Sequence, residues 1–507
     1  MRQWAWAIVA IVTLAVWAPV LTYDWVYMWD DAALFYGNWM VRQWNWEWIF
    51  RTQYYGHWMP LTWMSASATY ALFGYHASAW HAINVVLHTI SAVLFYFIAF
   101  RMIGSHPGAV VAALLFSIHP LRMESVAWIT ERKDVLMGVF FLGAILLWMQ
   151  GRRWWSFAAF VAACASKSPA VMLPVVLLAL EWLKEHGGVA YPIENRVETP
   201  SSSGATDGAR PGPGRYWPLA PFFAVSVIVS VVAFWSLHTI LISLPWSAVS
   251  LGPRLLHVAY SEVFYVWQTV WPARLSALIE YTWVPSWGQP QYPIAVAVCV
   301  LAAVGLARTW RRWPALTAAA ACYTVAVLPQ SGLFQNGPQL VANRYSYLAC
   351  LPLALLAGGA VTAGSRRWPR LSLASAAAGL VALIAVTETA LPMWRNSDAM
   401  WRYAALHEPT CTQCQDMATA ADYRDGNVAG ALWYTERAMV VSDTTPAPRW
   451  ERHWNRGVFL LQLGRREEAV AALRTYLALV PDARRDVEVD RDHIARARAA
   501  LASLGAL

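Results

Sequence analysis

The stretch that decides the fold is WAWAIVAIVTLAVWAPVLTYDWVYMWDD, residues 4–31. Its first part, 4–23, is apolar almost throughout, and about 20 such residues in a helix cross the hydrocarbon core of a bilayer. This part lacks a small-residue cleavage site, so we interpret it as a retained membrane anchor and not as a signal peptide. Two adjacent carboxylates, Asp30 and Asp31, then stand just beyond the membrane boundary. Charge at that depth usually has a partner or a function.

The composition of the whole chain agrees with a membrane protein. Of the 507 residues, 58% are hydrophobic and only 13% are charged, which is too apolar for an ordinary soluble protein. A net charge of +8 would suggest a nucleic-acid partner in a soluble domain. Here Lys and Arg gather in short loops instead, as the positive-inside rule predicts for a membrane protein. We predict an all-α, polytopic membrane helical bundle that binds no nucleic acid.

Apolar runs recur along residues 1–391, the predicted membrane domain. Eleven spans are predicted, at 4–23, 80–100, 108–121, 135–150, 154–166, 169–183, 217–243, 293–309, 314–330, 346–364 and 371–391. Basic residues fall on one side, which we predict is cytoplasmic together with the N-terminus and a flexible linker within 184–216. The first loop, 23–80, is then extracytoplasmic. The stretch 254–271 would reverse every later loop if it spanned, so we expect an interfacial or re-entrant helix there.

After residue 391 the apolar runs stop, and residues 392–507 are predicted to form a soluble helical domain on the extracytoplasmic face. The spacing typical of a tetratricopeptide helix pair occurs at Gly457, Leu460, Gly464, Ala469, Leu473 and Pro481. A weaker copy runs over 415–441. One or two such pairs cannot bury a solenoid core alone, so this domain is expected to pack on the membrane domain or on a partner.

Cys411 and Cys414 are the cysteines that stand at a motif-like spacing. An extracytoplasmic compartment permits disulfides, and two cysteines three apart at a helix start can reach each other. We favour a disulfide here over free thiols. A metal site would need further ligands, and none is evident at suitable spacing, so no metal ion is predicted.

Further polar residues lie on the predicted extracytoplasmic face together with Asp30 and Asp31. They form four clusters: His57 in 56–62; His119, Glu124, Glu131, Arg132, Lys133 and Asp134 in 119–134; Lys167 in 166–169; and Arg344 and Tyr345 in 343–345. The four cations of these clusters stand on a face where such residues are disfavoured, and they need an anion. Phosphate oxygens fit that need. The alternative is that these cations form structural salt bridges with Glu124, Glu131 and Asp134.

In this order, the polar clusters resemble a C-type (GT-C) glycosyltransferase, most closely the transmembrane-and-tetratricopeptide family of protein O-mannosyltransferases and its bacterial relatives. The resemblance rests on Asp30-Asp31, His57 with Pro60-Leu61-Thr62, the spacing of His81, Asn84 and His88, His119-Pro120 through Glu131-Arg132-Lys133-Asp134, Ser166-Lys167, Arg344-Tyr345 and the tail repeats. One departure is Asn343, where similar bacterial sequences usually carry Asp before Arg-Tyr.

The resemblance implies transfer of one sugar from a polyprenyl-phosphate carrier to an acceptor hydroxyl, with inversion at the anomeric carbon. It places the reaction on the extracytoplasmic face of a bacterial inner membrane. The expected partners are the lipid-linked sugar, the surrounding membrane lipid and an acceptor, a protein Ser or Thr or a glycan, which the tail would bind. No cofactor is implied. Two other functions stay open: a ligase or flippase for a lipid-linked envelope glycan, and a non-catalytic scaffold.

The chemistry of such a transfer assigns roles to the clustered residues. An acceptor hydroxyl needs a positioned carboxylate to take its proton, and a leaving phosphate needs cations. We predict Asp30 as the base and Asp31 as the residue that orients the acceptor or tunes its neighbour, although the sequence alone does not order the two. The predicted phosphate ligands are Arg132, Lys133, Lys167 and Arg344, and the predicted lining residues are His57, His119, Glu124, Glu131, Asp134 and Tyr345.

Overall fold

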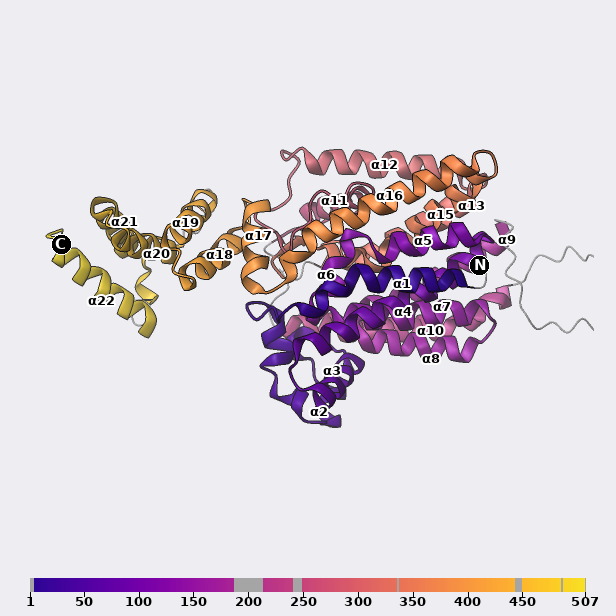
Figure 1. Cartoon of the computed structure of the whole chain (residues 1–507), viewed down its shortest axis with the longest axis horizontal. Coiled ribbons are helices and arrows are strands. Elements are labelled where there is room, and N and C mark those ends of the chain that lie inside the picture. Colours follow the sequence, from indigo (N-terminus) through magenta and orange to yellow (C-terminus); the bar gives the residue numbers. More distant parts are fainter. Residues whose placement is uncertain are drawn as a thin grey trace, which may run out of the picture. The chain divides into compact units, whose positions relative to one another are not determined.

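The computed structural model describes residues 4–186, 213–239, 249–334, 337–442, 449–484 and 487–506 (Figure 1). Most of the linker predicted within 184–216 lies outside the described residues. The chain divides into two compact units. Unit 1 consists of Met1–Leu275, Val284–Gly337 and Val341–Ser397, and unit 2 consists of Ser276–Trp283, Pro338–Leu340 and Asp398–Leu507. Two short segments from loops between apolar helices therefore belong to the same unit as the tail.

Unit 1 is helical. Its helices are α1 (Ala5–Trp17), α2 (Trp46–Arg51), α3 (Pro60–Phe73), α4 (Ala77–Ile103), α5 (His106–Ser117), α6 (Met123–Ala127), α7 (Arg132–Met149), α8 (Arg153–Ser166), α9 (Leu173–His186), α10 (Ala220–Thr239), α11 (Leu251–Val270), α12 (Gln291–Thr309), α13 (Pro314–Val327), α14 (Ser346–Ala349), α15 (Leu351–Ser365) and α16 (Pro369–Ala390). The long helix α4 packs against α1, α5 and α7 and so lies inside the bundle. It ends at Gly104, whose left-handed conformation (φ 72°) is a common helix stop.

The predicted apolar stretches fall on helices wherever they are described, but fewer than eleven have the dimensions of a span. Five described segments are long and apolar enough: Ala5–Thr22, Ala77–Ile103, Tyr216–Ser236, Gln291–Thr309 and Pro369–Trp394. Two bent helix pairs raise this number to seven. By contrast, α8, α9 and α13 have 14 residues each, about 21 Å of helix against about 30 Å of hydrocarbon. The apolar helices indicate a membrane protein, but the prediction of eleven spans is not confirmed.

Both bent pairs bend beside the polar clusters. Helix α5 meets the segment Pro120–Ala127 at 50°, and the segment Asn343–Ala349 meets α15 at 58°. A proline stands next to each break, at Pro120 and Pro352, and proline lacks the N–H that would continue a helix. The bends bring Glu124 of the first pair to Arg344 of the second.

Helix α11 buries several polar side chains together with Leu256 and Phe264, and it exposes apolar side chains on its outer face. Arg254, His257 and Gln268 are buried, whereas Trp267 and Val270 are exposed. This arrangement suits a helix whose outer face meets lipid. The helix is not among the described segments that meet the length and hydropathy of a span. That it is interfacial or re-entrant stays a prediction.

Unit 2 contains α17 (Ser397–His407), α18 (Thr412–Arg424), α19 (Val428–Ser442), α20 (Trp450–Gln462), α21 (Arg466–Leu479) and α22 (Glu488–Ser503). Helix α18 packs on α19, and α20 packs on α21. Each pair is joined by a short turn with a left-handed glycine, Gly426 or Gly464. Gly457 permits close packing, because a Cβ there would lie 2.5 Å from Leu473. These two helix pairs occupy the predicted repeat regions, and their assignment as tetratricopeptide repeats stays a prediction.

A two-stranded sheet, β1 (Ile279–Glu280) with β2 (Gln339–Val341), joins the two loop segments of unit 2. The carboxylate of Glu280 accepts hydrogen bonds from the backbone N–H (2.6 Å) and the hydroxyl (3.2 Å) of Thr412. A carboxylate at this position caps the first turn of α18 and complements the helix dipole. Cys411 and Cys414, joined by a disulfide in this structure, lie at the same helix start.

Candidate active site

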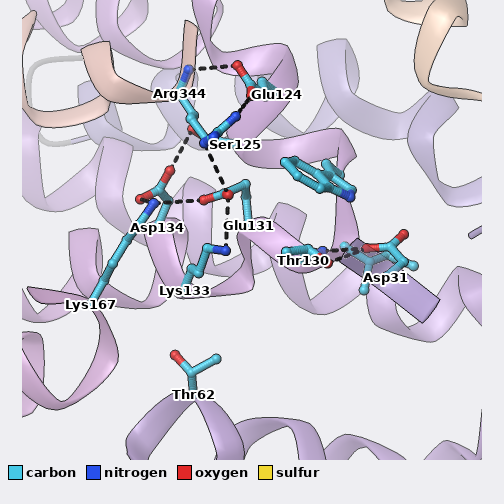
Figure 2. Close-up of polar contacts among 12 residues, drawn as sticks. Asp31, Thr62, Glu124, Ser125, Thr130, Glu131, Lys133, Asp134, Lys167 and Arg344 are labelled. Carbon is cyan, nitrogen blue, oxygen red and sulfur yellow. Dashed lines mark hydrogen bonds and ion pairs between the residues drawn. The ribbon is translucent and has the colours of Figure 1, made fainter. Parts of the chain in front are cut away.

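Asp31 is fully buried, and its carboxylate joins two distant segments. Its Oδ2 accepts a hydrogen bond from the backbone N–H of Val26 (2.8 Å). Its Oδ1 accepts from the backbone N–H (2.9 Å) and the hydroxyl (2.6 Å) of Thr130 (Figure 2). Burial raises the pKa of Asp31 to about 7, although these hydrogen bonds favour the charged form. Protein donors occupy both oxygens, so Asp31 is suited to positioning its neighbour.

Asp30 has no hydrogen bond or ion pair with the described part of the chain, and its side chain is only half-buried. The charges of Lys133, Arg344 and Glu131 act on it, so Asp30 lies within electrostatic range of these three residues. Burial raises the pKa of Asp30, and the two cations oppose the rise. Unlike Asp31, this carboxylate is available to a ligand.

Glu131, which ends a 3-10 turn before α7, is the centre of a charged cluster (Figure 2). Its Oε2 lies 2.9 Å from Lys167 Nζ, and its Oε1 lies 3.3 Å from Lys133 Nζ and 3.5 Å from Arg344 Nε. Burial alone would raise the pKa of Glu131, but these three cations hold it well below its usual range. Glu131 is therefore a fixed negative charge around which three of the predicted phosphate ligands gather.

Two further carboxylates complete the charged cluster. Asp134 Oδ1 lies 2.6 Å from Lys167 Nζ, and Asp134 Oδ2 accepts a hydrogen bond from Ser125 (3.2 Å). Glu124 accepts from the backbone N–H of Arg344 (2.9 Å) and also pairs with its guanidinium. The salt bridges that were the alternative to a phosphate site are thus present in this structure.

The indole of Trp128 lies against two of the cations, a contact that sequence reasoning missed. Its ring centroid is 6.0 Å from Lys133 Nζ and 5.6 Å from the guanidinium carbon of Arg344, which is cation–π range. Trp29, the residue before Asp30, packs on the same indole at 5.1 Å between ring centroids. The signal in the sequence was only that Trp128 stands three residues before Glu131.

His57 lies within electrostatic range of the charged cluster, because the charges of Lys133 and Lys167 act on its ring. Burial is the larger effect, and both effects lower the pKa of His57, so the ring is neutral at physiological pH. Tyr55 and Gly56 before it have positive φ values of 52° and 73°. A positive φ is uncommon for a residue with a side chain, so this backbone turn is a constrained feature of the site.

Thr62 contributes to the site by holding two helices together. Its hydroxyl donates to the backbone carbonyl of Ser166 at 2.9 Å, which ties α3 to the end of α8. Lys167 is the next residue along the chain, and Figure 2 labels it together with Thr62. The first loop is thereby fixed to the segment that carries one cluster cation.

Arg132 does not join the charged cluster. Its guanidinium is fully buried and donates to the side chain of Asn84, to the carbonyl of Trp80 (2.8 Å) and to the hydroxyls of Ser65 (3.2 Å) and Thr69 (3.1 Å). All four partners are neutral and belong to α3 and α4. Arg132 therefore joins α7 to these helices, and its geometry does not support the predicted phosphate contact.

Of the two remaining predicted lining residues, His119 makes contacts within the fold, whereas Tyr345 contacts the charged cluster. His119 has both ring nitrogens engaged, because Nδ1 accepts from the N–H of Leu121 (3.2 Å) and Nε2 donates to the carbonyl of Thr269 (3.0 Å). It caps the break after α5. Tyr345 instead receives a hydrogen bond from Arg344 (3.4 Å) and so borders the charged cluster.

Among the described residues, no group of three or more His, Cys, Asp or Glu side chains could hold a metal ion. The three cluster carboxylates each face a lysine or an arginine, as the distances above show. A divalent ion would have to displace those cations.

Comparisons with known proteins give a partial similarity. No family model and no solved structure matches the chain. Protein O-mannosyl-transferase TMTC3 of Mus musculus is 31% identical over 93 residues, which are 18% of this chain and 10% of that protein. Protein O-mannosyl-transferase tmtc2 of Xenopus laevis is 35% identical over 91 residues, 18% of this chain and 11% of that protein. Protein O-mannosyl-transferase Tmtc1 of Drosophila melanogaster is 32% identical over 100 residues, 19% and 12% of the two chains.

The matched part thus spans about a tenth of the length of these relatives. Over that part the chain is similar to TMTC-type protein O-mannosyl-transferases, and its apolar helices indicate a membrane protein.

Proposed function

We propose that the protein is a membrane glycosyltransferase that moves one sugar from a polyprenyl-phosphate carrier to an acceptor hydroxyl, with inversion at the anomeric carbon. The observation that carries this proposal is Asp30, a half-buried carboxylate that has no hydrogen bond or ion pair among the described residues and that lies within electrostatic range of Lys133 and Arg344. A base for the hydroxyl and cations for the phosphate are the two requirements of the reaction. The partial similarity to protein O-mannosyl-transferases supports this reaction class and favours a protein Ser or Thr as the acceptor.

The proposed reaction is a single displacement. The acceptor oxygen attacks the anomeric carbon, and the bond from that carbon to the phosphate oxygen breaks, with its electron pair going to the phosphate. Asp30 takes the hydroxyl proton as the new bond forms. Attack from the face opposite the leaving phosphate inverts the configuration.

Asp31 is a positioning residue in this scheme. Its bonds to Val26 and Thr130 fix the backbone on which Asp30 stands. Thr130 immediately precedes Glu131, so the same contact links the proposed base to the charged cluster. The distance between proton acceptor and phosphate site is thereby set by the protein before substrate binds.

The leaving phosphate is assigned to Lys133, Lys167 and Arg344. An ammonium group has three N–H donors, and among the described residues Lys133 makes one ion pair, so it has donors left for an anion. Lys167 and Arg344 have several carboxylate partners and fix the position of Lys133 through Glu131. Charge-assisted hydrogen bonds at a partly desolvated site stabilise the developing phosphate charge more than water does.

The proposal also includes orientation and partners. The bias of Lys and Arg between the apolar stretches supports a cytoplasmic N-terminus and an extracytoplasmic site and tail. The bacterial inner membrane is proposed from the resemblance alone. The membrane domain would be of the GT-C type, and the helix pairs of unit 2 would bind the acceptor. The proposal includes no resident cofactor or metal.

The test is release of polyprenyl phosphate from a polyprenyl-phosphate monosaccharide labelled in the sugar, using purified full-length protein with and without acceptor peptide. Wild-type protein should release the carrier and label the peptide. Asp30→Asn should do neither, whereas Asp24→Asn, a matched change at an exposed carboxylate of the same loop, should retain activity. A ligase or flippase for a polymer, or a scaffold, would give no release from any monosaccharide donor, and that result across several sugars would refute the proposal.

A further inference from the structure

A second feature of unit 1 is a pocket of about 350 Å³ between α5, α11 and α15. Most of its lining is apolar and includes Phe116, Val266, Leu353 and Ala357. Its polar residues include Arg122, which the proposed reaction does not use. Val266 and Val270 line the pocket and are also exposed on the outer face of α11, so the pocket borders the apolar surface described above.

Arg122 is buried to 1% exposure, yet two of its nitrogens lack partners. Nη2 donates to Ser346, whereas Nε and Nη1 are buried and have no hydrogen-bond partner among the described residues. The thiol of Cys350 also interacts with this guanidinium, but sulfur is a weak acceptor. The rings of Phe116 (5.8 Å) and Tyr347 (5.4 Å) lie in cation–π range and offset only part of the cost of burial.

Arg132 provides the comparison within the same chain. It is equally buried, but all three of its nitrogens donate to protein oxygens. In the described part of the chain, no carboxylate forms an ion pair with Arg122. A buried guanidinium with two unpaired nitrogens and no ion pair is costly, and an anion bound in the pocket would remove that cost.

The lining restricts what kind of anion can bind. A free phosphate would leave the apolar part of the pocket unfilled, whereas a phosphate ester with a long apolar chain satisfies both parts. The location adds a further restriction. Arg122 bonds Ser346, two residues after Arg344, and Glu124, two residues after Arg122, pairs with Arg344. A phosphate at Arg122 would thus lie next to the charged cluster.

We infer that this pocket binds a polyprenyl phosphate, with the phosphate on Nε and Nη1 of Arg122 and the first part of the chain along α11 and α15. The inference rests on the proposed function for the identity of the lipid. It adds a phosphate contact and a chain-binding surface that the charged cluster does not supply.

The experiment measures lipid binding to purified full-length protein in detergent by native mass spectrometry. The probes are a short-chain polyprenyl phosphate, the polyprenol of the same chain and a phosphatidylglycerol. Wild-type protein should bind the polyprenyl phosphate at least about tenfold more tightly than the polyprenol, because two charge-assisted hydrogen bonds depend on the phosphate. It should also bind it at least about tenfold more tightly than the phosphatidylglycerol, whose phosphate is a diester with a glycerol headgroup and two acyl chains in place of one polyprenyl chain. Arg122→Met should lower the affinity for the polyprenyl phosphate about tenfold, and the preference over the polyprenol that remains should come from the charged cluster. Arg101→Met, at a half-buried arginine at the end of α4 outside the pocket, should change nothing.

Ala357→Trp provides a second variant, because it fills the pocket and leaves Arg122 in place. It should weaken binding of both polyprenyl compounds, and it decides the matter if Arg122→Met fails to fold. Unchanged polyprenyl phosphate binding in a folded Arg122→Met or Ala357→Trp protein would overturn the inference. Equal binding of phosphatidylglycerol by the wild type would also overturn it, since the pocket would then be a general site for anionic lipid.

The test of lipid binding in the pocket can fail or succeed independently of the test of sugar transfer. Asp30→Asn should abolish transfer and leave polyprenyl phosphate binding unchanged. If wild-type protein binds the lipid through Arg122 but transfers no sugar, the pocket stands and the proposed reaction fails. If transfer occurs and both pocket variants bind normally, the reaction stands and the pocket assignment fails.

Discussion

Arg132 and Lys133 are consecutive cations at the start of α7, and they differ in their partners. Arg132 donates to neutral groups of α3 and α4, whereas Lys133 faces the carboxylate of Glu131 and the ring of Trp128. If Arg132 is removed, its neutral hydrogen-bond acceptors stay buried and have no donor. Glu131 has two other cations, so Lys133 can turn to a substrate anion at little cost. The type of residue therefore indicates less about its role than the charge of its partners does.

The largest expected effect concerns the base beside the charged cluster. Asp30→Asn should lower kcat for sugar transfer by roughly 10² to 10⁴, because an amide cannot accept the hydroxyl proton. The melting temperature should not fall, since Asp30 has no hydrogen bond to lose among the described residues. Asp31→Asn should lower both kcat and the melting temperature, because its amide would face the donors of Thr130. An Asp30→Asn enzyme within about tenfold of wild type would exclude the base role.

The second prediction tests the network of neutral partners. Arg132→Met should destabilise unit 1 by several kcal/mol, at about 1–3 kcal/mol for each buried acceptor left unsatisfied, among them Asn84 and the carbonyl of Trp80. Denaturation of detergent-solubilised protein measures this loss. Any folded fraction should bind the donor normally. Donor binding that fails in a stable Arg132→Met protein would restore Arg132 to the phosphate site.

The third prediction tests the other side of the comparison. Lys133→Met should leave the melting temperature near that of the wild type, because Lys167 and Arg344 still neutralise Glu131. It should weaken donor binding or slow turnover by about 1.5–3 kcal/mol, the value of a hydrogen bond to a charged group. Titration with a labelled donor and single-turnover kinetics give these numbers. A large loss of stability with unchanged donor affinity would make Lys133 a structural residue like Arg132.

The difference between Arg132 and Lys133 shows which features of the candidate site could be predicted from the sequence and which could not. Residue types at a membrane boundary indicated Asp30, Lys133, Lys167 and Arg344, because charge is costly there and needs a reason. Which cation meets an anion depends on side-chain direction at the start of α7, and no local pattern encodes that direction. Thr130 and Trp128 escaped notice because Thr and Trp are common at interfaces.

The fold was predictable where the signal was local. Apolar runs located the helices, since hydrophobicity over a long window is a property of the segment itself. The prediction of eleven spans is not confirmed, because α8 and α13 are shorter than the hydrocarbon core of a bilayer and two helix pairs bend next to prolines. Nothing in residues 276–283 or 338–340 marks them as part of unit 2. Their place depends on the pairing of β1 with β2 and on Glu280 at the start of α18, both of which are long-range contacts.

The fourth prediction compares unit 1 with unit 2. Replacing Cys411 and Cys414 together by Ser should lower the unfolding free energy of unit 2 by about 2 kcal/mol, since the disulfide closes only a short loop. Hydrolysis of the donor by water should be unchanged, because the charged cluster lies in unit 1. Thermal unfolding with and without reductant should show the same loss in wild-type protein and no effect in the double variant. Alkylation of both wild-type thiols without reductant would contradict the disulfide.

The last prediction concerns pH, and its sign differs between activity and stability. The base must be ionised, so the rate should fall tenfold for each pH unit below the pKa of Asp30. Burial raises that pKa, so the fall should begin at a higher pH than for an ordinary aspartate. Lys133 opposes the rise, and therefore Lys133→Met should move the acidic limb of kcat/KM to still higher pH. Arg132→Met should not move it if Arg132 belongs only to the neutral network.

The contribution of Asp31 to the free energy of unfolding should fall as the pH rises, whereas the rate of transfer rises with pH. Asp31 has a pKa of about 7 in the folded state against about 4 in an unfolded chain, so the folded state binds its proton more tightly. The stability that this proton contributes is fully present below about pH 4 and is lost as the pH rises through about 7. Unfolding of wild-type protein and of Asp31→Asn across this range isolates the contribution, because the amide does not titrate.

The activity measurement has its own contradicting outcome. If the acidic limb of kcat/KM in wild-type protein lies at the pH of a free aspartate and does not shift in Lys133→Met, then Asp30 does not lie in the electrostatic field of the charged cluster.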